Sequence, residues 1–387
     1  MDKANMFWQT YLNLENETLE VAKYIYITDT TTKLDNRSKT VKNIEDERQL
    51  LTYSSYIADL LVRCCVEIEA ISKEMYYDNG GTKARGSIDL YFDTDCIALL
   101  NQKWNLSNKV VMIVASNFNL LKDENRNLTP LNNADKRSKT IWAKAYQAVK
   151  HDRYNSLYLG NIKALINAMA ALYLLNIYYR DIKLTVKYMD IHNLDMSFGS
   201  KIFSLRNPNQ EALLEIANGI KRDDELHSTD SPYIAKYTDY YYKQVLEARQ
   251  QYLEGLNNYL LSQPEWQDPN FLHQLSIAKE KDPSQRVIPL WELCKYRINK
   301  KISSNLSFEE RRRIFIQCEE WNCSIRLRNK HLSENELTPD NIQKEIDDAG
   351  IYYAMEIDMK YSYQWIHKIY NEGECEIVLD KGNVKYV

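Results

Sequence analysis

Apolar residues recur every three or four positions along most of the chain, which is the period of an amphipathic α-helix. In the first half, this pattern predicts helices over residues 5–27, 54–77, 89–104, 138–154 and 156–187. In the second half, it predicts helices over residues 232–261, from Asp268-Pro269 onward, over 288–302, over 308–330, and from Thr338-Pro339 to about Tyr370. The expected fold class is therefore all-α.

Local polar residues mark several ends of these helices. Ser54 or Ser55 is placed to cap the second helix, and Asn79-Gly80-Gly81 follows its last apolar turn. Ser307 and Glu310 have the spacing of a capping box for the helix over 308–330.

A few stretches do not have the helical period. Residues 28–32 are expected to form a threonine-rich loop, and residues 33–50 a polar loop with some helix. The β-branched run over 109–121 predicts an extended excursion or a small hairpin. Residues 122–136 and 192–210 are expected to be irregular. The tail CEIVLDKGNVKYV predicts a small β-hairpin around Lys381-Gly382-Asn383.

A charged joint, KRDDELHSTDSP at residues 221–232, separates the two halves of this 387-residue chain. We take it as a domain boundary, which gives a helical domain over 1–220 and a second helical domain over 221–387 that ends in the hairpin. No internal repeat period is apparent, so the pattern does not support a solenoid.

The formal net charge of −4 argues against a general nucleic-acid coat protein, but it leaves room for a local basic cleft. The seven cysteines form no CxxC pair, which indicates a reducing cytoplasm and no structural zinc site. The apolar run over 164–179 is shorter than the ~20 residues of a membrane span. It also contains Asn167 and Asn176, so a buried core helix and no membrane association are expected.

The segment over 142–180 holds the candidate chemistry. At about 100° per residue, Trp142, Ala145, Tyr146 and Val149 share one face, and Lys144, Gln147, His151 and Asn155 share the opposite face. His151 is thereby expected to point to solvent, where it titrates near neutral pH and meets a phosphate beside a lysine; the alternative is an ordinary surface histidine. Arg153 falls on the apolar side, and a half-buried arginine there needs a carboxylate from Asp59, Glu67 or Glu69.

One predicted helix contains YQAVKHDR. An amphipathic helix at 54–77 precedes it, and a long Ala/Asn/Leu-rich helix follows it. This arrangement resembles the HEPN superfamily (higher eukaryotes and prokaryotes nucleotide-binding domains). The resemblance covers about residues 5–205. It implies a HEPN-like helical bundle and a bacterial defence or toxin-type protein. Catalytic members of this family are metal-independent ribonucleases that act as homodimers, with an arginine and a histidine from each protomer at the two-fold.

The family pattern has an arginine, four to six residues, and then a histidine. Lys144 occupies the arginine position here, with His151 as the histidine, and Lys150 and Arg153 are neighbouring cations. Arg326 and His331 also have this spacing, which chance alone would produce about once in this sequence. Together with Arg328 and the Arg311-Arg312-Arg313 run, they predict a basic strip for RNA; the alternative is a solvated helix face.

Two functions follow from these residues. In the first, the protein binds or cleaves RNA without a metal or cofactor. His151 moves the proton of the 2′-hydroxyl or of the leaving oxygen, and Lys144, Lys150 or Arg153 stabilises the phosphate charge. In the second, the protein is a non-catalytic interaction or sensor protein whose tyrosine-rich carboxyl half binds a protein partner. The substitution of lysine for arginine at position 144 favours the second, because lysine lacks the planar fork of arginine.

Overall fold

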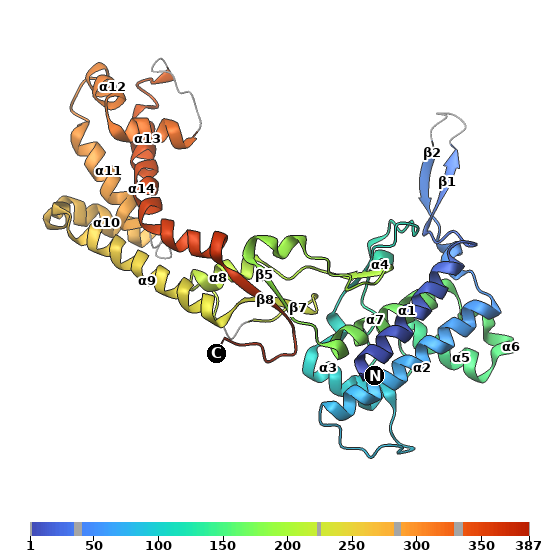
Figure 1. Cartoon of the computed structure of the whole chain (residues 1–387). Coiled ribbons are helices and arrows are strands. Elements are labelled where there is room, and N and C mark those ends of the chain that lie inside the picture. The colour runs from blue at the N-terminus through green and yellow to red at the C-terminus, as the bar shows by residue number, and fades with distance from the viewer. Residues whose placement is uncertain (1, 35–40, 223–225, 282–287, 329–335, 387) are drawn as a thin grey trace. The chain divides into compact units, whose positions relative to one another are not determined.

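The computed structural model describes residues 2–34, 41–222, 226–281, 288–328 and 336–386 (Figure 1). These residues form two compact units. Unit 1 comprises residues 1–241 together with 373–387, and unit 2 comprises residues 242–372. The predicted division at residue 220 falls inside unit 1, and the carboxyl end of the chain returns to that unit.

Unit 1 is built around one central helix, α7 (Ile162–Arg180), which contacts α1 (Lys3–Val21), α2 (Ser55–Asp78) and α5 (Ile141–His151) (Figure 1). Of its 19 residues, 15 are buried. Within the described part of the chain, α7 alone is long and apolar enough to cross a membrane, a property that it shares with core helices of globular proteins. Its burial inside unit 1 agrees with the predicted core helix.

Side-chain caps explain where the main helices of unit 1 begin. The side-chain oxygens of Ser54, Thr140 and Asn161 accept hydrogen bonds from backbone N–H groups in the first turns of α2, α5 and α7. The helix α7 ends at Arg180, seven residues before the predicted end, and the cap residue Asp181 has a left-handed backbone (φ 48°). Shorter helices complete the unit: α3 (Ala98–Trp104), α4 (Asp123–Arg126), α6 (Arg153–Ser156) and α8 (Glu211–Ala217).

Three small antiparallel sheets make the all-α expectation only partly correct, since the structure is 62% helix and 9% strand. β1 (Thr30–Leu34) pairs with β2 (Val41–Glu45), and a 3-10 turn at Glu47–Leu51 follows. β3 (Val111–Ile113) lies between β4 (Asn127–Leu128) and β6 (Phe203–Leu205). The loop predicted over 28–32 and the loop with some helix predicted over 33–50 are therefore only partly correct, because paired strands occupy part of both, while the 3-10 turn supplies some helix.

The third sheet corrects the predicted tail. β8 (Glu374–Leu379) lies between β5 (Leu184–Lys187) and β7 (Tyr233–Tyr237), so it is a central strand and not one arm of a hairpin. β7 is buried along its whole length, and β8 alternates buried and more accessible residues. The helix predicted over 156–187 wrongly includes β5, and the helix predicted over 232–261 wrongly includes β7.

Unit 2 is helical throughout its described residues. Its elements are the greater part of α9 (Asp239–Leu261), then α10 (Pro269–Lys281), α11 (Ile288–Lys301), α12 (Phe308–Ile316), α13 (Glu319–Arg328) and α14 (Ile342–His367), which continues as a π-helical turn, Lys368–Glu372. The capping box of Ser307 and Glu310 is confirmed. The single helix predicted over 308–330 is two helices, because the chain breaks at Gln317 and Cys318.

Candidate functional site

The helix α5 is oriented by the apolar face that the sequence predicts. Trp142, Ala145, Tyr146 and Val149 are all buried, and the indole Nε1 of Trp142 donates to the carbonyl of Pro130 over 2.9 Å. This buried face of α5 packs against α2 and α7, which fixes the orientation of the helix. Because the helix cannot rotate without exposing these side chains, the residues on its opposite face are fixed toward solvent.

His151 is the last residue of α5 and is exposed, as is Lys144 on the same face. His151 lies seven positions after Lys144, which places their Cα atoms about 10 Å apart along the axis. This distance is too long for both side chains to hold one phosphate oxygen from a single copy unless the lysine side chain extends toward the histidine. His151 is neither walled in by apolar side chains nor held in an ion pair among the described residues.

Lys150 is exposed, and its side chain contacts Tyr146, which lies one turn earlier on α5. Its Nζ lies 3.2 Å from the hydroxyl of Tyr146 and 5.1 Å from the centre of that ring. Burial and the nearby Glu69 carboxylate raise the pKa of the Tyr146 phenol, which therefore stays protonated. Lys150 is thus held against a buried ring of its own helix.

Arg153 forms one of the predicted ion pairs. Its side chain is about half exposed (48%), and its Nη1 lies 2.7 Å from Oδ1 of Asp59, one of the three carboxylates expected as partners. The helical phase is lost at Asp152, whose backbone (φ −145°, ψ 67°) ends α5 and whose carboxylate caps α6. Counting Arg153 on the apolar face of one continuous helix was therefore wrong.

Two exposed tyrosines follow on the same segment. Tyr154 is 95% exposed, and Tyr158 in the next 3-10 turn is 55% exposed. We name the set Lys144, His151, Arg153, Tyr154 and Tyr158 the α5–α6 surface. Cationic groups next to exposed aromatic rings are the combination that binds single-stranded nucleic acid. The sequence contained this signal as YNSLY, but the tyrosines were not singled out.

Several arginines of the predicted RNA-binding strip of unit 2 make contacts within the unit, although the Arg326 side chain is 62% exposed. Arg328 has only 9% of its side chain exposed and bridges Glu345 (2.6 Å) and Asp348 (3.2 Å) of α14. Arg326 pairs with Glu356. Two more arginines have partners nearby, Gln343 for Arg311 and Glu309 for Arg312, and the predicted His331 lies outside the described residues.

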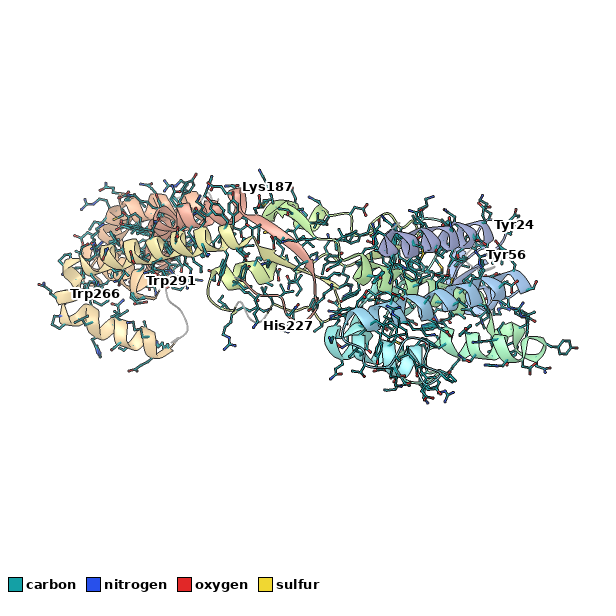
Figure 2. The ribbon with its side chains drawn as sticks, turned by 60° about the horizontal axis from the view of Figure 1, so that its bottom comes forward. Tyr24, Tyr56, Lys187, His227, Trp266 and Trp291 are labelled. Atoms are coloured by element: carbon teal, nitrogen blue, oxygen red, sulfur yellow. The ribbon has the colours of Figure 1, made fainter. Side chains whose placement is uncertain are left out.

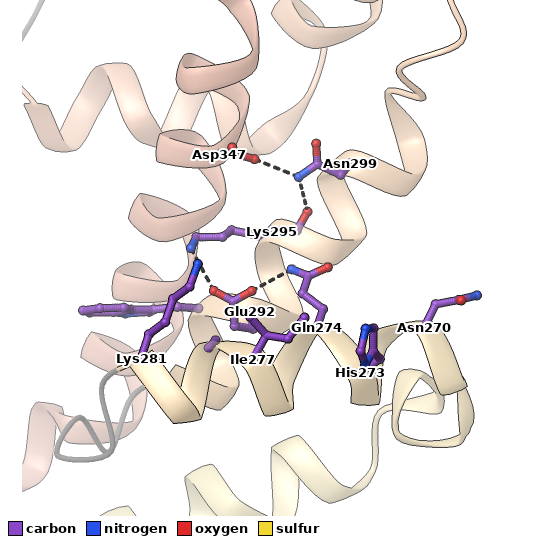
Figure 3. A pocket seen from close by; sticks show the side chains of 11 residues that line it. Asn270, His273, Gln274, Ile277, Lys281, Glu292, Lys295, Asn299 and Asp347 are labelled. Carbon is purple, nitrogen blue, oxygen red and sulfur yellow. Dashed lines mark hydrogen bonds and ion pairs between the residues drawn. The ribbon is translucent and has the colours of Figure 1, made fainter.

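Unit 2 instead contains a cleft that the sequence did not indicate. The cleft has a volume of about 630 Å³ and lies between α10, α11 and α14 (Figure 3). Its polar lining is ordered by three hydrogen bonds. The Glu292 carboxylate accepts from Gln274 (2.6 Å) and Lys295 (2.8 Å), and Asp347 accepts from Asn299 (2.9 Å). The signal in the sequence is a polar stripe along α10 at helical spacing.

Exposed aromatic side chains also gather at one end of unit 1. Tyr24 (86% exposed) and Tyr56 (49%) line a hollow between the end of α1 and the start of α2, and both are labelled in Figure 2. Glu20, Ile25 and Ile57 complete its walls, so it is more apolar than the α5–α6 surface. It contains none of the predicted site residues.

A search of the described residues finds no group of three His, Cys, Asp or Glu side chains that could hold a metal ion. No protein-family model, no curated protein and no solved structure matches the chain, so the HEPN resemblance stays a prediction from the sequence.

Proposed function

We propose that this chain is a HEPN-like RNA-binding protein of the bacterial defence or toxin type, which cleaves RNA without a metal through His151. The observation that carries the proposal is an exposed imidazole at the end of a helix whose opposite face is locked into the core. Lys144 on the same face and the exposed rings of Tyr154 and Tyr158 supply charge and stacking for a flexible RNA strand. A cytoplasmic location and a homodimer belong to the same proposal.

The chemistry follows from the groups present. The neutral imidazole of His151 accepts the proton of a ribose 2′-hydroxyl, and the 2′ oxygen attacks the adjacent phosphorus. The bond from phosphorus to the 5′ oxygen breaks, and an imidazolium protonates the leaving oxygen. The products are a 2′,3′-cyclic phosphate and a 5′-hydroxyl. A second copy supplies the second imidazole, since unit 1 presents one histidine on this surface.

A non-catalytic docking function is the second candidate, and one feature of unit 2 favours it. Met355, Met359, Tyr363 and Ile366 lie at spacings of four, four and three on α14, and all four are exposed. Such a stripe on a helix suits a protein partner. Lysine at position 144 also favours docking over catalysis.

One experiment separates the two candidates. The full chain is incubated with total RNA in excess chelator, and the RNA ends are analysed for wild type, His151→Ala and His192→Ala. His192 is a matched control because it is also an exposed histidine of unit 1. If the protein cleaves RNA through His151, wild type and His192→Ala produce cyclic phosphate ends, and His151→Ala does not. Intact RNA with all three proteins, and no retardation of RNA in a gel, favours docking.

A further inference from the structure

The cleft of unit 2 has a rigid frame. Phe271 and Leu275 of α10 pack against Leu293 of α11, and all three are buried. The helix α14 approaches α11 closely at Gly350, where an added Cβ would lie 3.0 Å from the Cα and N of Lys295. The three helices therefore hold their positions without a ligand, and side chains on rigid elements make a preorganised site.

One wall of the cleft is apolar. Trp291, Ile277 and Ala278 line it, and Trp291 also packs against the buried cluster that includes Leu290 and Cys294. A partly buried indole anchored in this way offers a flat, fixed contact area. A planar heterocycle is the ligand group that best complements such a wall, because base–aromatic stacking contributes substantially to binding.

The polar groups opposite are held in fixed orientations. Glu292 is only 8% exposed, and its two oxygens accept from the Gln274 amide and from Lys295. Since the amide nitrogen of Gln274 is used for Glu292, its carbonyl oxygen is directed the other way (Figure 3). That oxygen, together with the Asp347 carboxylate, presents acceptors for N–H groups on the edge of a ring.

The charges limit how many phosphates the cleft can take. Lys281 in the last turn of α10 and Lys295 are balanced by Glu292 and Asp347, and His273 adds a titratable ring. Lys295 is already paired with Glu292, which leaves Lys281 as the cation best placed for an anion. This balance suits one phosphate and disfavours a triphosphate or a polyanionic strand.

We propose that the cleft binds a nucleoside monophosphate. The base stacks on Trp291, the Gln274 carbonyl accepts a hydrogen bond from an exocyclic amine, and the phosphate pairs with Lys281. The volume of about 630 Å³ is within the ~300–1,000 Å³ range of small-molecule sites. All of these residues belong to unit 2, so the inference is independent of RNA cleavage at the α5–α6 surface.

Calorimetric titration of the full chain tests the ligand class. The probes are adenosine 5′-monophosphate, cytidine 5′-monophosphate, uridine 5′-monophosphate, adenosine and ribose 5-phosphate. The expected result is a dissociation constant below about 1 mM for adenosine or cytidine monophosphate. Adenosine and ribose 5-phosphate bind about tenfold more weakly or worse, and uridine monophosphate, which lacks the amine, also binds more weakly. No heat with any nucleotide, or ribose 5-phosphate binding as tightly as the nucleotides, would overturn the proposal.

Matched variants then test the assigned contacts. Lys281→Ala is expected to weaken binding about tenfold, whereas Lys279→Ala, an exposed lysine in the same turn that does not line the cleft, leaves it unchanged. Trp291→Leu weakens binding about tenfold or more. A base stacked on Trp291 is also expected to quench the tryptophan fluorescence of the protein, so Trp291→Phe keeps binding but loses most of this quenching. Trp266→Phe serves as the fluorescence control (Figure 2).

Thermal melting confirms that each variant is folded. If Trp291→Leu does not fold, Trp291→Phe and Lys281→Ala still decide the outcome. Equal weakening by Lys279→Ala and Lys281→Ala would mean general charge attraction, and the proposed site would be wrong.

Discussion

Replacing Lys109 with methionine should destabilise unit 1 more than replacing any exposed lysine. The Lys109 side chain is completely buried, and its Nζ lies 2.9 Å from Oδ2 of Asp380. It also donates to the carbonyls of Ser228 (2.7 Å) and Ser231 (3.1 Å). One ammonium group therefore connects the residue after β8 to the loop before β7.

The size of the effect follows from what remains after the change. Methionine fills a similar volume, but Asp380, 6% exposed, keeps only backbone donors, the N–H groups of Ser228 (3.0 Å) and Gly382 (3.2 Å). The carbonyls of the buried Ser231 and the partly buried Ser228 also lose this donor. Removing one partner of a buried ion pair costs about 3–5 kcal/mol, whereas an exposed pair contributes about 1 kcal/mol or less.

Urea unfolding of the full chain, followed by circular dichroism, measures the difference. With an m-value of about 3 kcal/mol/M, Lys109→Met lowers the midpoint of the unit 1 transition by about 1–1.7 M. The control is Lys23→Met, which removes an exposed pair with Glu20 (2.6 Å) and shifts the midpoint by less than about 0.3 M. Equal shifts for the two variants would refute the reasoning, because they would mean that the Lys109 ammonium is hydrated.

Three further predictions concern other groups. Hydrogen bonds, first from Lys163, lower the pKa of Glu47 to about 2, so its stabilising effect is complete above about pH 5 and disappears as the pH falls to 2. Glu47→Gln should therefore lower the melting temperature at pH 7 but not at pH 2, and equal losses at both would contradict this. Burial raises the pKa of four thiols to about 12, so a disulfide reagent at pH 8 should modify only the half-buried Cys318 until urea exposes all seven. Arg328→Ala should lower the melting temperature more than Arg326→Ala, because the Arg328 ion pair is the more buried. RNA affinity should be unchanged in both variants. A loss of RNA affinity would support the predicted basic strip for RNA.

The helices were predictable because their signals are local. The amphipathic period of α2, the continuous apolar run of α7, and the caps at Ser54 and Ser307 depend on residues within a few positions of each other. The strands were not predictable, because β3, β4 and β6 are two or three residues long and pair with segments far away in the sequence. The sequence of β8 alternates apolar and polar residues, but its partner strands, β5 and β7, lie inside stretches whose composition also suits a helix.

The candidate site divides in the same way. The exposure of His151 follows from the helical phase of α5, which its buried face fixes. The exposure of Arg153 does not, because Asp152 interrupts that phase. The pairing of Arg328 with Glu345 depends on how α13 packs on α14, and neither helix contains a signal for it. Tertiary packing therefore decided which predicted cations remained available.

The rate at which a fluorescent RNA is cleaved in excess chelator tests the central claim most directly. If His151 transfers the proton, His151→Ala should reduce the rate by at least about a hundredfold, and His192→Ala should leave it within about twofold. Cleavage by His151→Ala at the rate of wild type would contradict the assignment of this residue and, with it, the proposed ribonuclease.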